Sequence, residues 1–394
     1  MNVAAAAAAT FTVSGPASST AGNSFNVTIT AKDAYGNVAT GYTGTVQFTS
    51  SDGQAVLPAN YTFTGGDAGV KTVSVTLKTA GNQTITATDT VTGTITGTSG
   101  TAAVAAASAT HLSVSAPGSS TAGSAFNVTV TARDAYGNTA IGYVGTVAFT
   151  STDGQAVLPA NYSFSSANAG VETFSVTLKT SGNQTVTATD TVTGSITGTS
   201  GTVSVSAASA TTLTVTAGAN QTAGTAFNVT VTAKDAYGNI ATGYTGTVQL
   251  TSTDGQAVLP SNYTFVGGDA GVHNFSVTLK TAGNQSVTAT DTATGSIAGT
   301  SGTVVVSPAA AAILTVSAPA NATAGSAFNV TLTAKDAYGN TATGYTGTVT
   351  FTSTDGAAVL PSNYTFVGGD AGVHTFSVTL KTAGNRTITA TDTV

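Results

Sequence analysis

The sequence predicts an all-β protein, built as a tandem array of four β-sandwich repeats. Three observations predict this fold class: a long internal repeat, a period-two alternation of apolar and polar residues, and the absence of a helix-length apolar stripe. The string Asp-Ala-Tyr-Gly-Asn begins at Asp33, Asp134, Asp235 and Asp336, and no gap interrupts the register. One repeat therefore takes 101 residues.

The repeat boundaries follow from this spacing. We expect four repeats, at residues 9–109, 110–210, 211–311 and 312–394. The fourth stops at Val394, which matches Val91, so it is expected to lack its final strand. Residues 1–8 resemble the end of such a final strand, and we interpret them as the remnant of a preceding one. The chain is then either a window from a longer array or a subunit that lends its first strand to a neighbour.

Repeat 1 predicts three strands in its first half. The strand at 10–15 carries the apolar pair Phe11 and Val13, whose positions are apolar in all four repeats. The strand at 25–33 alternates apolar with polar residues, as expected when one face lies in a core. The strand at 45–50 follows a glycine-bearing turn.

Four further strands are predicted in the second half of repeat 1. The strand at 60–64 follows a turn that contains Pro58, and the strand at 70–77 alternates valine with serine and threonine. The strands at 83–90 and 101–106 complete the set, and the first of them is rich in β-branched residues that suit a pleated surface. Seven short strands in about 100 residues are typical of an immunoglobulin-like sandwich. The absence of cysteine and tryptophan argues against an antibody-type domain.

The repeated motifs resemble a known kind of domain. Repeat 3 contains Ala-Lys-Asp-Ala-Tyr-Gly-Asn from Ala233, Gly-Thr-Val from Gly246 and Asp-Ala-Gly-Val-His-Asn-Phe from Asp269. This pattern resembles bacterial immunoglobulin-like and filamin-type repeats of large cell-surface, adhesin-like proteins, and the resemblance covers essentially the whole chain. It implies an extracellular or cell-surface bacterial location and a use mainly as stalks, by analogy with such proteins.

Composition excludes several classes of function. The chain has 10 cations and 16 carboxylates, a net charge of −6, and only 7% charged residues. Nucleic-acid binding needs a clustered basic stripe, which is absent. There is no cysteine for disulfides or thiolate chemistry, and no apolar run of about 20 residues to span a bilayer. The alanine run after Val3 has no basic region before it, so we expect no signal peptide.

The acidic residues recur at fixed positions of the repeat. We expect Asp33 and its equivalents to be turn carboxylates that accept backbone N–H bonds. An alternative hypothesis is a calcium site at one end of the sandwich, where the loops after the second, fourth and sixth strands lie together. Several carboxylate oxygens at one place suit Ca²⁺. Without calcium, lysine and water would be the partners of these carboxylates. At the joint of repeats 2 and 3 this calcium hypothesis brings together Asp153, Lys179, Asp235, Asp269 and Asp291.

No catalytic or cofactor-binding residues are assigned. The 12 tyrosines recur at the positions of Tyr35, Tyr42 and Tyr61, where we expect packing against the core rather than stacking on sugar rings. His273 and His374 occupy a position that holds Lys71 in repeat 1 and Glu172 in repeat 2. A position that accepts all three residue types indicates solvent exposure. A catalytic triad needs a histidine held beside a nucleophile, so we expect no enzyme.

The leading functional hypothesis is a structural spacer or stalk. Residues 205–213 join two repeats without a flexible linker, which predicts a stiff array of roughly 40 Å per repeat and roughly 160 Å in all. The expected partners are neighbouring repeats. Two alternatives stay open: a weak multivalent module for a surface glycan or protein, and a filament subunit in which residues 3–8 complete repeat 4 of the next molecule.

Overall fold

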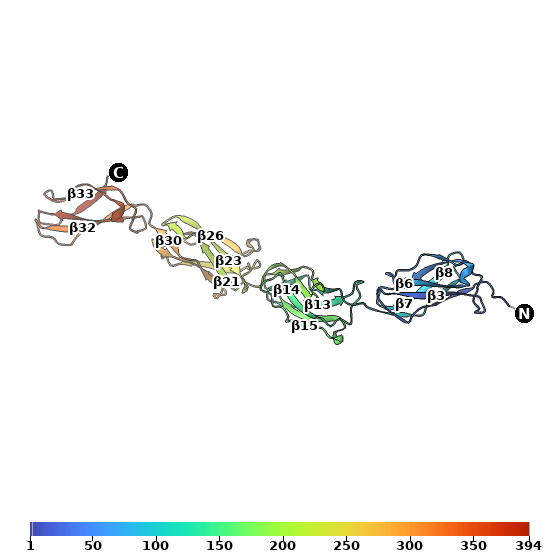
Figure 1. Ribbon diagram of the computed structural model, residues 1–394. Helices are drawn as coiled ribbons and strands as arrows, with labels where there is room; N and C mark the ends of the chain where they lie inside the picture. The colour runs from blue at the N-terminus through green and yellow to red at the C-terminus, as the bar shows by residue number, and fades with distance from the viewer. Residues whose placement is uncertain (2, 394) are drawn as a thin grey trace. The chain divides into compact units, whose positions relative to one another are not determined.

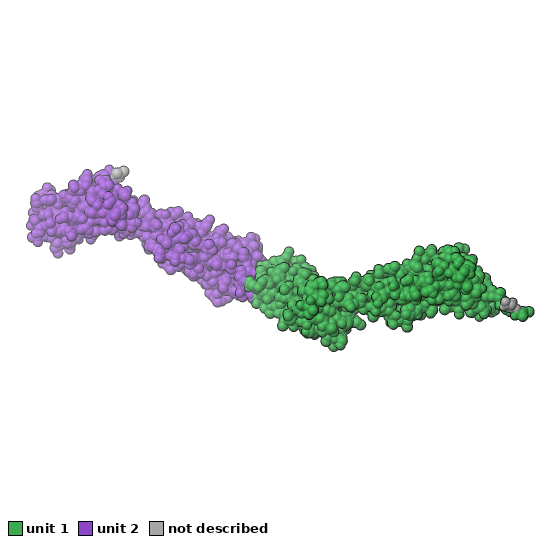
Figure 2. Space-filling model, viewed as in Figure 1, with its two compact units in different colours: residues 1–206 green, residues 207–394 purple. Residues whose placement is uncertain are grey.

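The computed structural model describes residues 1 and 3–393 and is all-β (Figure 1). Its described residues fall into two compact units, Met1–Ser206 and Ala207–Val394, coloured separately in Figure 2. The helical elements of the described residues are single 3₁₀ turns, one in each repeat: η1 Gly65–Asp67, η2 Ser166–Asn168, η3 Gly267–Asp269 and η4 Gly368–Asp370. No helix in this part of the chain is long and apolar enough to cross a membrane.

The first unit contains two copies of one ten-strand pattern. In repeat 1 the strands are β1 Thr10–Ser14, β2 Ser18–Thr20, β3 Ser24–Lys32, β4 Thr45–Ser50, β5 Tyr61–Thr62, β6 Val70–Thr76, β7 Gly81–Gln83, β8 Ile85–Asp89, β9 Thr96–Thr98 and β10 Ala102–Ala105. In repeat 2 they are β11 His111–Ser115, β12 Ser119–Thr121, β13 Ala125–Arg133, β14 Thr146–Ser151, β15 Tyr162–Ser163, β16 Val171–Thr177, β17 Gly182–Gln184, β18 Val186–Asp190, β19 Thr197–Thr199 and β20 Val203–Ser206.

The second unit begins with the same pattern. Repeat 3 has β21 Thr212–Ala217, β22 Asn220–Thr222, β23 Ala226–Lys234, β24 Thr247–Ser252, β25 Tyr263–Thr264, β26 Val272–Thr278, β27 Gly283–Gln285, β28 Val287–Asp291, β29 Ala298–Thr300 and β30 Val304–Ser307. Repeat 4 has fewer strands: β31 Ile313–Ser317, β32 Ala327–Lys335, β33 Thr348–Ser353, β34 Tyr364–Thr365, β35 Val373–Thr379 and β36 Ile388–Asp392.

Each complete repeat is a sandwich of two layers, antiparallel except for one short parallel pair. In repeat 1 one layer has the order β1-β3-β6. The other combines β5-β4-β8-β9 with β2-β10-β7, because β7 and β8 are halves of one strand interrupted at Thr84. Ser19 pairs in parallel with Val104, whereas Gly81 pairs with the same valine in the antiparallel sense. This immunoglobulin-like order is the fold class that the sequence predicts.

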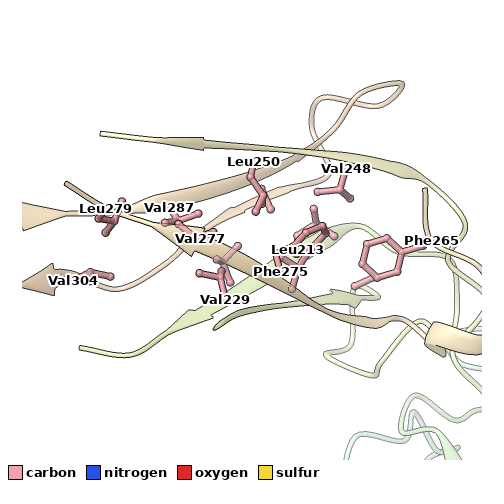
Figure 3. Packing of buried hydrophobic residues seen from close by; sticks show 14 of the residues in the cluster. Leu213, Val229, Val248, Leu250, Phe265, Phe275, Val277, Leu279, Val287 and Val304 are labelled. Carbon is pink, nitrogen blue, oxygen red and sulfur yellow. The ribbon is translucent and has the colours of Figure 1, made fainter. Parts of the chain in front are cut away.

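The core lies between the two layers. In repeat 3 the buried side chains include Val229 and Val277 from one layer and Val248 and Val287 from the other. Figure 3 shows these residues together with Phe265, which follows the short strand β25. Buried residues alternate with half-buried threonines, so the period-two pattern of the sequence fixes which face each strand buries.

The strand prediction missed two short strands. Ser18–Thr20 and Thr96–Thr98 are polar or glycine-bearing segments without apolar alternation, and they become strands by pairing with β10 and β8. The strand predicted at 83–90 is interrupted at Thr84, whose N–H donates to Ser51 Oγ at 2.8 Å. Repeat 4 lacks its final strand, as predicted.

Candidate functional site

The linker between repeats 1 and 2 is tied to the repeat that follows it. β10 ends at Ala105 and β11 begins at His111. The N–H of Ala107 donates to Asp134 Oδ2 at 2.9 Å, and the N–H of Thr110 donates to the carbonyl of Arg133 at 2.7 Å. A segment held this way is not a free coil, because its backbone donors have fixed partners.

Asp134 holds both this linker and its own loop. Its Oδ1 accepts from the N–H groups of Tyr136 and Asn138, each at 2.9 Å, and its Oδ2 accepts from Asn138 Nδ2 at 2.8 Å. Burial favours a higher pKa for Asp134, but these hydrogen bonds outweigh it and lower the pKa below the usual value. This is the turn carboxylate expected for Asp33 and its equivalents.

The side chain of Asn138 reaches across to repeat 1. Its Nδ2 donates to the carbonyl of Lys78 at 2.7 Å, and its Oδ1 accepts from the N–H of Ala80 at 2.8 Å. The side chain of Gln54 adds a longer hydrogen bond of 3.5 Å to the carbonyl of Tyr136. One amide side chain thus satisfies two backbone groups of the neighbouring repeat while Asp134 orients it.

Tyr136 provides the apolar part of this contact. Its ring packs against the core cluster of repeat 1, and Lys78 Nζ lies 5.7 Å from the ring centroid. Gly22, with φ of +84°, lies so close to the ring that a Cβ there would collide with it. We call the set of Gly22, Lys78, Ala80, Tyr136 and Asn138 the junction contact.

The same junction contact recurs between repeats 3 and 4, inside the second unit. Asn340 Nδ2 donates to the carbonyl of Lys280 at 2.7 Å, and Asn340 Oδ1 accepts from the N–H of Ala282 at 2.8 Å. The ring of Tyr338 lies over Gly224 and 5.7 Å from Lys280 Nζ. Recurrence of each partner shows that the repeat encodes the junction as well as the sandwich.

Asp52 fixes the loop that presents Lys78 and Ala80. Its carboxylate accepts from the N–H groups of Lys78 at 2.5 Å, Thr79 at 2.9 Å and Gln54 at 2.9 Å. Burial again favours a higher pKa for Asp52, but the hydrogen bonds from Thr79, Lys78 and Gln54 outweigh it and lower the pKa. The carbonyl that meets Asn138 is therefore held by a buried carboxylate.

The carboxylates of the calcium hypothesis each accept hydrogen bonds from donors of the protein. Asp153 accepts from the N–H groups of Gln155, Lys179 and Thr180. Asp235 accepts from Ala208, Tyr237 and Asn239; Asp269 from Val266, Tyr263 and His273; Asp291 from Tyr244, Ala293 and Thr294.

These contacts are hydrogen bonds from protein donors. N–H and O–H donors point at the carboxylate oxygens, and a metal ion there would face the same donors. Within residues 1 and 3–393 no group of three or more His, Asp or Glu side chains is placed to hold a metal. Lys179 contributes a partner to Asp153 through its backbone N–H.

The tyrosines equivalent to Tyr42 and Tyr61 pack within their own repeat, whereas Tyr35 is 84% exposed. Tyr42 packs edge-on against Phe63 with ring centroids 5.1 Å apart, and its hydroxyl donates to Asp89. Tyr61 packs against the same phenylalanine at 5.6 Å. His273 stacks on Tyr263 at 3.8 Å and lies 3.0 Å from Asp269, a surface arrangement in which Lys71 takes the equivalent place in repeat 1.

A pocket of about 470 Å³ lies beside the linker of repeat 2, lined by residues that include Tyr143, Val144 and Val192, and the other repeats have pockets of about 430–480 Å³ at the equivalent place. Repeat 2 differs in its exposed apolar side chains there: Val144 and Val192 are 63% and 89% exposed, and Ile141, next to the lining residue Gly142, is 60% exposed. Threonine stands at the positions of Ile141 and Val144 in the other three repeats, so this apolar rim is specific to repeat 2.

Comparison with known proteins finds similarity among solved structures. No family model and no curated protein matches the chain. The adhesin FdeC of Escherichia coli aligns at 22% identity over 78% of this chain and 100% of that one, with a TM-score of 0.37. Invasin, a bacterial integrin-binding protein, aligns at 17% identity over 98% and 76%, with a TM-score of 0.32. InvD of Yersinia pseudotuberculosis aligns at 21% identity over 69% and 83%, with a TM-score of 0.30.

The junction residues were not identified from the sequence. Tyr136 and Asn138 belong to the very string that defines the repeat, yet neither was expected to contact a neighbouring repeat. The signal was the retention of asparagine at Asn37, Asn138, Asn239 and Asn340, which a simple turn does not require.

Proposed function

We propose that this chain is a spacer segment of a bacterial cell-surface or secreted adhesin-like protein. The observation that carries the proposal is the junction contact, which occurs with the same partners between repeats 1 and 2 and between repeats 3 and 4. A spacer needs joints that resist bending, and it needs the same joint many times. Its partners are the neighbouring repeats themselves.

The physics of the junction supports this role. Hydrogen bonds that tie Asn138 to Lys78 and Ala80 are each worth about 1 kcal/mol, and the packing of Tyr136 adds apolar burial. The hydrogen bond from Ala107 to Asp134 anchors the linker and limits its movement. Directional bonds on one side of a joint and an anchored strand on the other restrict bending more than either does alone.

Surface composition is consistent with a spacer and gives no reason to propose catalysis. The outer faces of the strands carry threonine pairs, such as Thr28 with Thr72 and Thr86 with Thr98, whose hydroxyls bond to each other. Such faces stay hydrated with few charges. We infer that the chain is not an enzyme.

A display experiment tests the spacer role. The chain is anchored to a bacterial surface by its last residue, with an epitope tag before Met1, and compared with an anchored single-repeat version. We expect a bulky antibody-coated particle to bind the tag on the full array several times more often. Equal binding for one and four repeats would contradict the proposal.

A second candidate function rests on the apolar rim of repeat 2. Exposed Ile141, Val144 and Val192 around a pocket suit weak binding of a protein partner with an apolar side chain. The variant Ile141→Thr/Val144→Thr restores the residues of the other repeats and is the matched control. Binding to host-surface proteins that the double variant loses would favour this function, whereas equal binding by both chains would exclude it.

A further inference from the structure

Three asparagine positions of the repeat carry the acceptor motif of N-linked glycosylation, Asn-X-Ser/Thr. In repeat 1 they are Asn26, Asn60 and Asn82, each with threonine two residues later, and the motif recurs at all three positions in repeats 2, 3 and 4. Every one of these asparagines is exposed. The junction asparagines Asn138 and Asn340 are outside such motifs, because alanine stands two residues after each. The motif therefore marks surface asparagines that are separate from those of the junction contact.

The backbone around the three motif positions differs. Asn26 lies in the nine-residue strand β3 and pairs with Ser74 of β6, and Asn82 lies in β7 and pairs with Ala103 of β10. Asn60 lies outside every strand, in an irregular segment just before β5. An acceptor amide has to enter the active site of a transferase, so an exposed loop position suits this reaction better than a position inside a paired strand.

The hydroxyl that completes the motif is exposed beside Asn60. Thr62 belongs to the two-residue strand β5, and its Oγ1 lies 2.8 Å from Thr45 Oγ1 in a shared hydrogen bond. Repeat 2 has serine at this position, and Ser163 Oγ shares a hydrogen bond of 2.7 Å with Thr146 Oγ1. The exchange of threonine for serine keeps the hydroxyl, which is the group that the motif requires.

The strand β5 lies at an edge of its layer. The order of that layer is β5-β4-β8-β9, and β15, β25 and β34 have the same end position in repeats 2, 3 and 4. An edge strand exposes unpaired backbone groups, and many proteins protect such an edge with lysine. Residues 57–64 and their equivalents contain no lysine or arginine. A sugar on the asparagine directly before β5 would cover this edge.

We propose that the preferred acceptor sites of N-linked glycosylation in this chain are Asn60, Asn161, Asn262 and Asn363. The amide nitrogen of the asparagine attacks C1 of a hexose that is activated by a phosphate leaving group. The bond between nitrogen and C1 forms, the bond from C1 to the phosphate oxygen breaks, and one amide proton passes to a base of the transferase. The donor is a nucleotide-activated hexose or a lipid-linked oligosaccharide, which share this chemistry. The proposal goes beyond the spacer role and does not depend on it.

Mass spectrometry of peptides from the chain, purified from the cells that produce it, tests the proposal. We expect peptides with Asn60 or its equivalents to carry a hexose or an oligosaccharide, at an occupancy several times that of peptides with Asn26 or its equivalents. A single hexose would support the proposal with a nucleotide-activated donor, and a larger glycan would support it with a lipid-linked donor. Unmodified asparagines at all four proposed positions, or equal occupancy at the Asn26 positions, would overturn the proposal.

Substitution of the hydroxyl residue tests whether the motif directs the modification. Thr62→Ala keeps Asn60 but removes the hydroxyl, whereas Thr62→Ser places the residue of repeat 2 in repeat 1. Both variants are produced in the same cells, and Asn161 of the same chain is the internal control. We expect Thr62→Ala to lose the sugar at Asn60 alone and Thr62→Ser to keep it, with the thermal midpoint of both unchanged because Thr62 is exposed. Wild-type occupancy of Asn60 in Thr62→Ala would overturn the proposal.

Discussion

Gly22 of repeat 1 lies directly against the ring of Tyr136 of repeat 2, and a Cβ at this position would collide with that ring unless the ring moved. Gly325 has the same place in repeat 4 and the same backbone conformation, but open space around it. Gly22 is therefore constrained twice, by its positive φ and by the neighbouring repeat, whereas Gly325 is constrained by φ alone. An alanine substitution at Gly325 therefore measures the effect of backbone strain alone, whereas the same substitution at Gly22 adds the loss of the junction contact.

The amide of Asn138 protects a backbone group of repeat 1. Asn138→Ala should speed hydrogen exchange in residues 78–82 by about fivefold to tenfold, because the N–H of Ala80 loses a hydrogen bond worth about 1 kcal/mol. Exchange measured by mass spectrometry checks this. The control is Asn37→Ala, which removes the same side-chain hydrogen bond to an aspartate at an exposed position. Equal exchange in the two variants would show that Asn138 does not hold the junction.

The buried carboxylates predict how stability depends on pH. Hydrogen bonds lower the folded-state pKa of Asp153, so its contribution to stability is full above the unfolded pKa of about 3.9 and is lost as pH falls through the lower folded pKa. We expect a flat thermal midpoint from about pH 5 to pH 8 and a steep fall below about pH 4. Asp153→Asn should lower the midpoint of one repeat at neutral pH and reduce its fall in acid. An unchanged acid profile would contradict this assignment.

A second glycine, Gly145, leaves room for the hydrogen-bonded pair of Tyr143 and Asp190. Tyr143 donates to Asp190 at 2.5 Å, and a Cβ on Gly145 would collide with both groups. Gly145→Ala should destabilise repeat 2 by about 1–3 kcal/mol. Gly142→Ala is the control, because a Cβ there meets nothing within 4 Å. We follow unfolding in urea by circular dichroism. For Gly145→Ala, but not for Gly142→Ala, the part of the unfolding transition that comes from repeat 2 should move to a lower urea concentration.

Calcium should leave the junction unchanged. The carboxylates near it accept hydrogen bonds from protein donors, so a cation would have to displace those donors. We expect the same distance distribution between spin labels in repeats 1 and 2 in calcium and in chelator. A distribution that broadens in chelator would instead support metal ligation at the junction.

The sequence predicts the sandwich well because its information is local. Alternation along residues 25–33 and 70–77 determines which side of each strand is buried, and the repeat length sets the number of sandwiches. The short strand at Ser18–Thr20 was missed because it exists only through pairing with β10, which is far along the chain. The local pattern of apolar and polar residues does not reveal that a segment becomes a strand only when a distant strand pairs with it.

The candidate site was harder to predict for a similar reason. Carboxylates at fixed positions suggested a cation, since a sequence does not show the backbone N–H groups that satisfy Asp52 and Asp134. Asn138 acts on residues of another repeat, and its reach depends on the angle at which two folded sandwiches meet. Repetition of a motif shows that a residue is needed but not on which neighbour it acts.

The most direct test of the junction is a distance distribution between two spin labels, one in repeat 1 and one in repeat 2, in three chains. Wild type and Gly325→Ala should give the same narrow distribution, because Gly325 faces no neighbouring repeat. Gly22→Ala should give a much broader one, because its methyl group displaces Tyr136. If Gly22→Ala and wild type give equally narrow distributions, the contact between Gly22 and Tyr136 does not hold the repeats in place, and the proposed basis of the spacer is wrong.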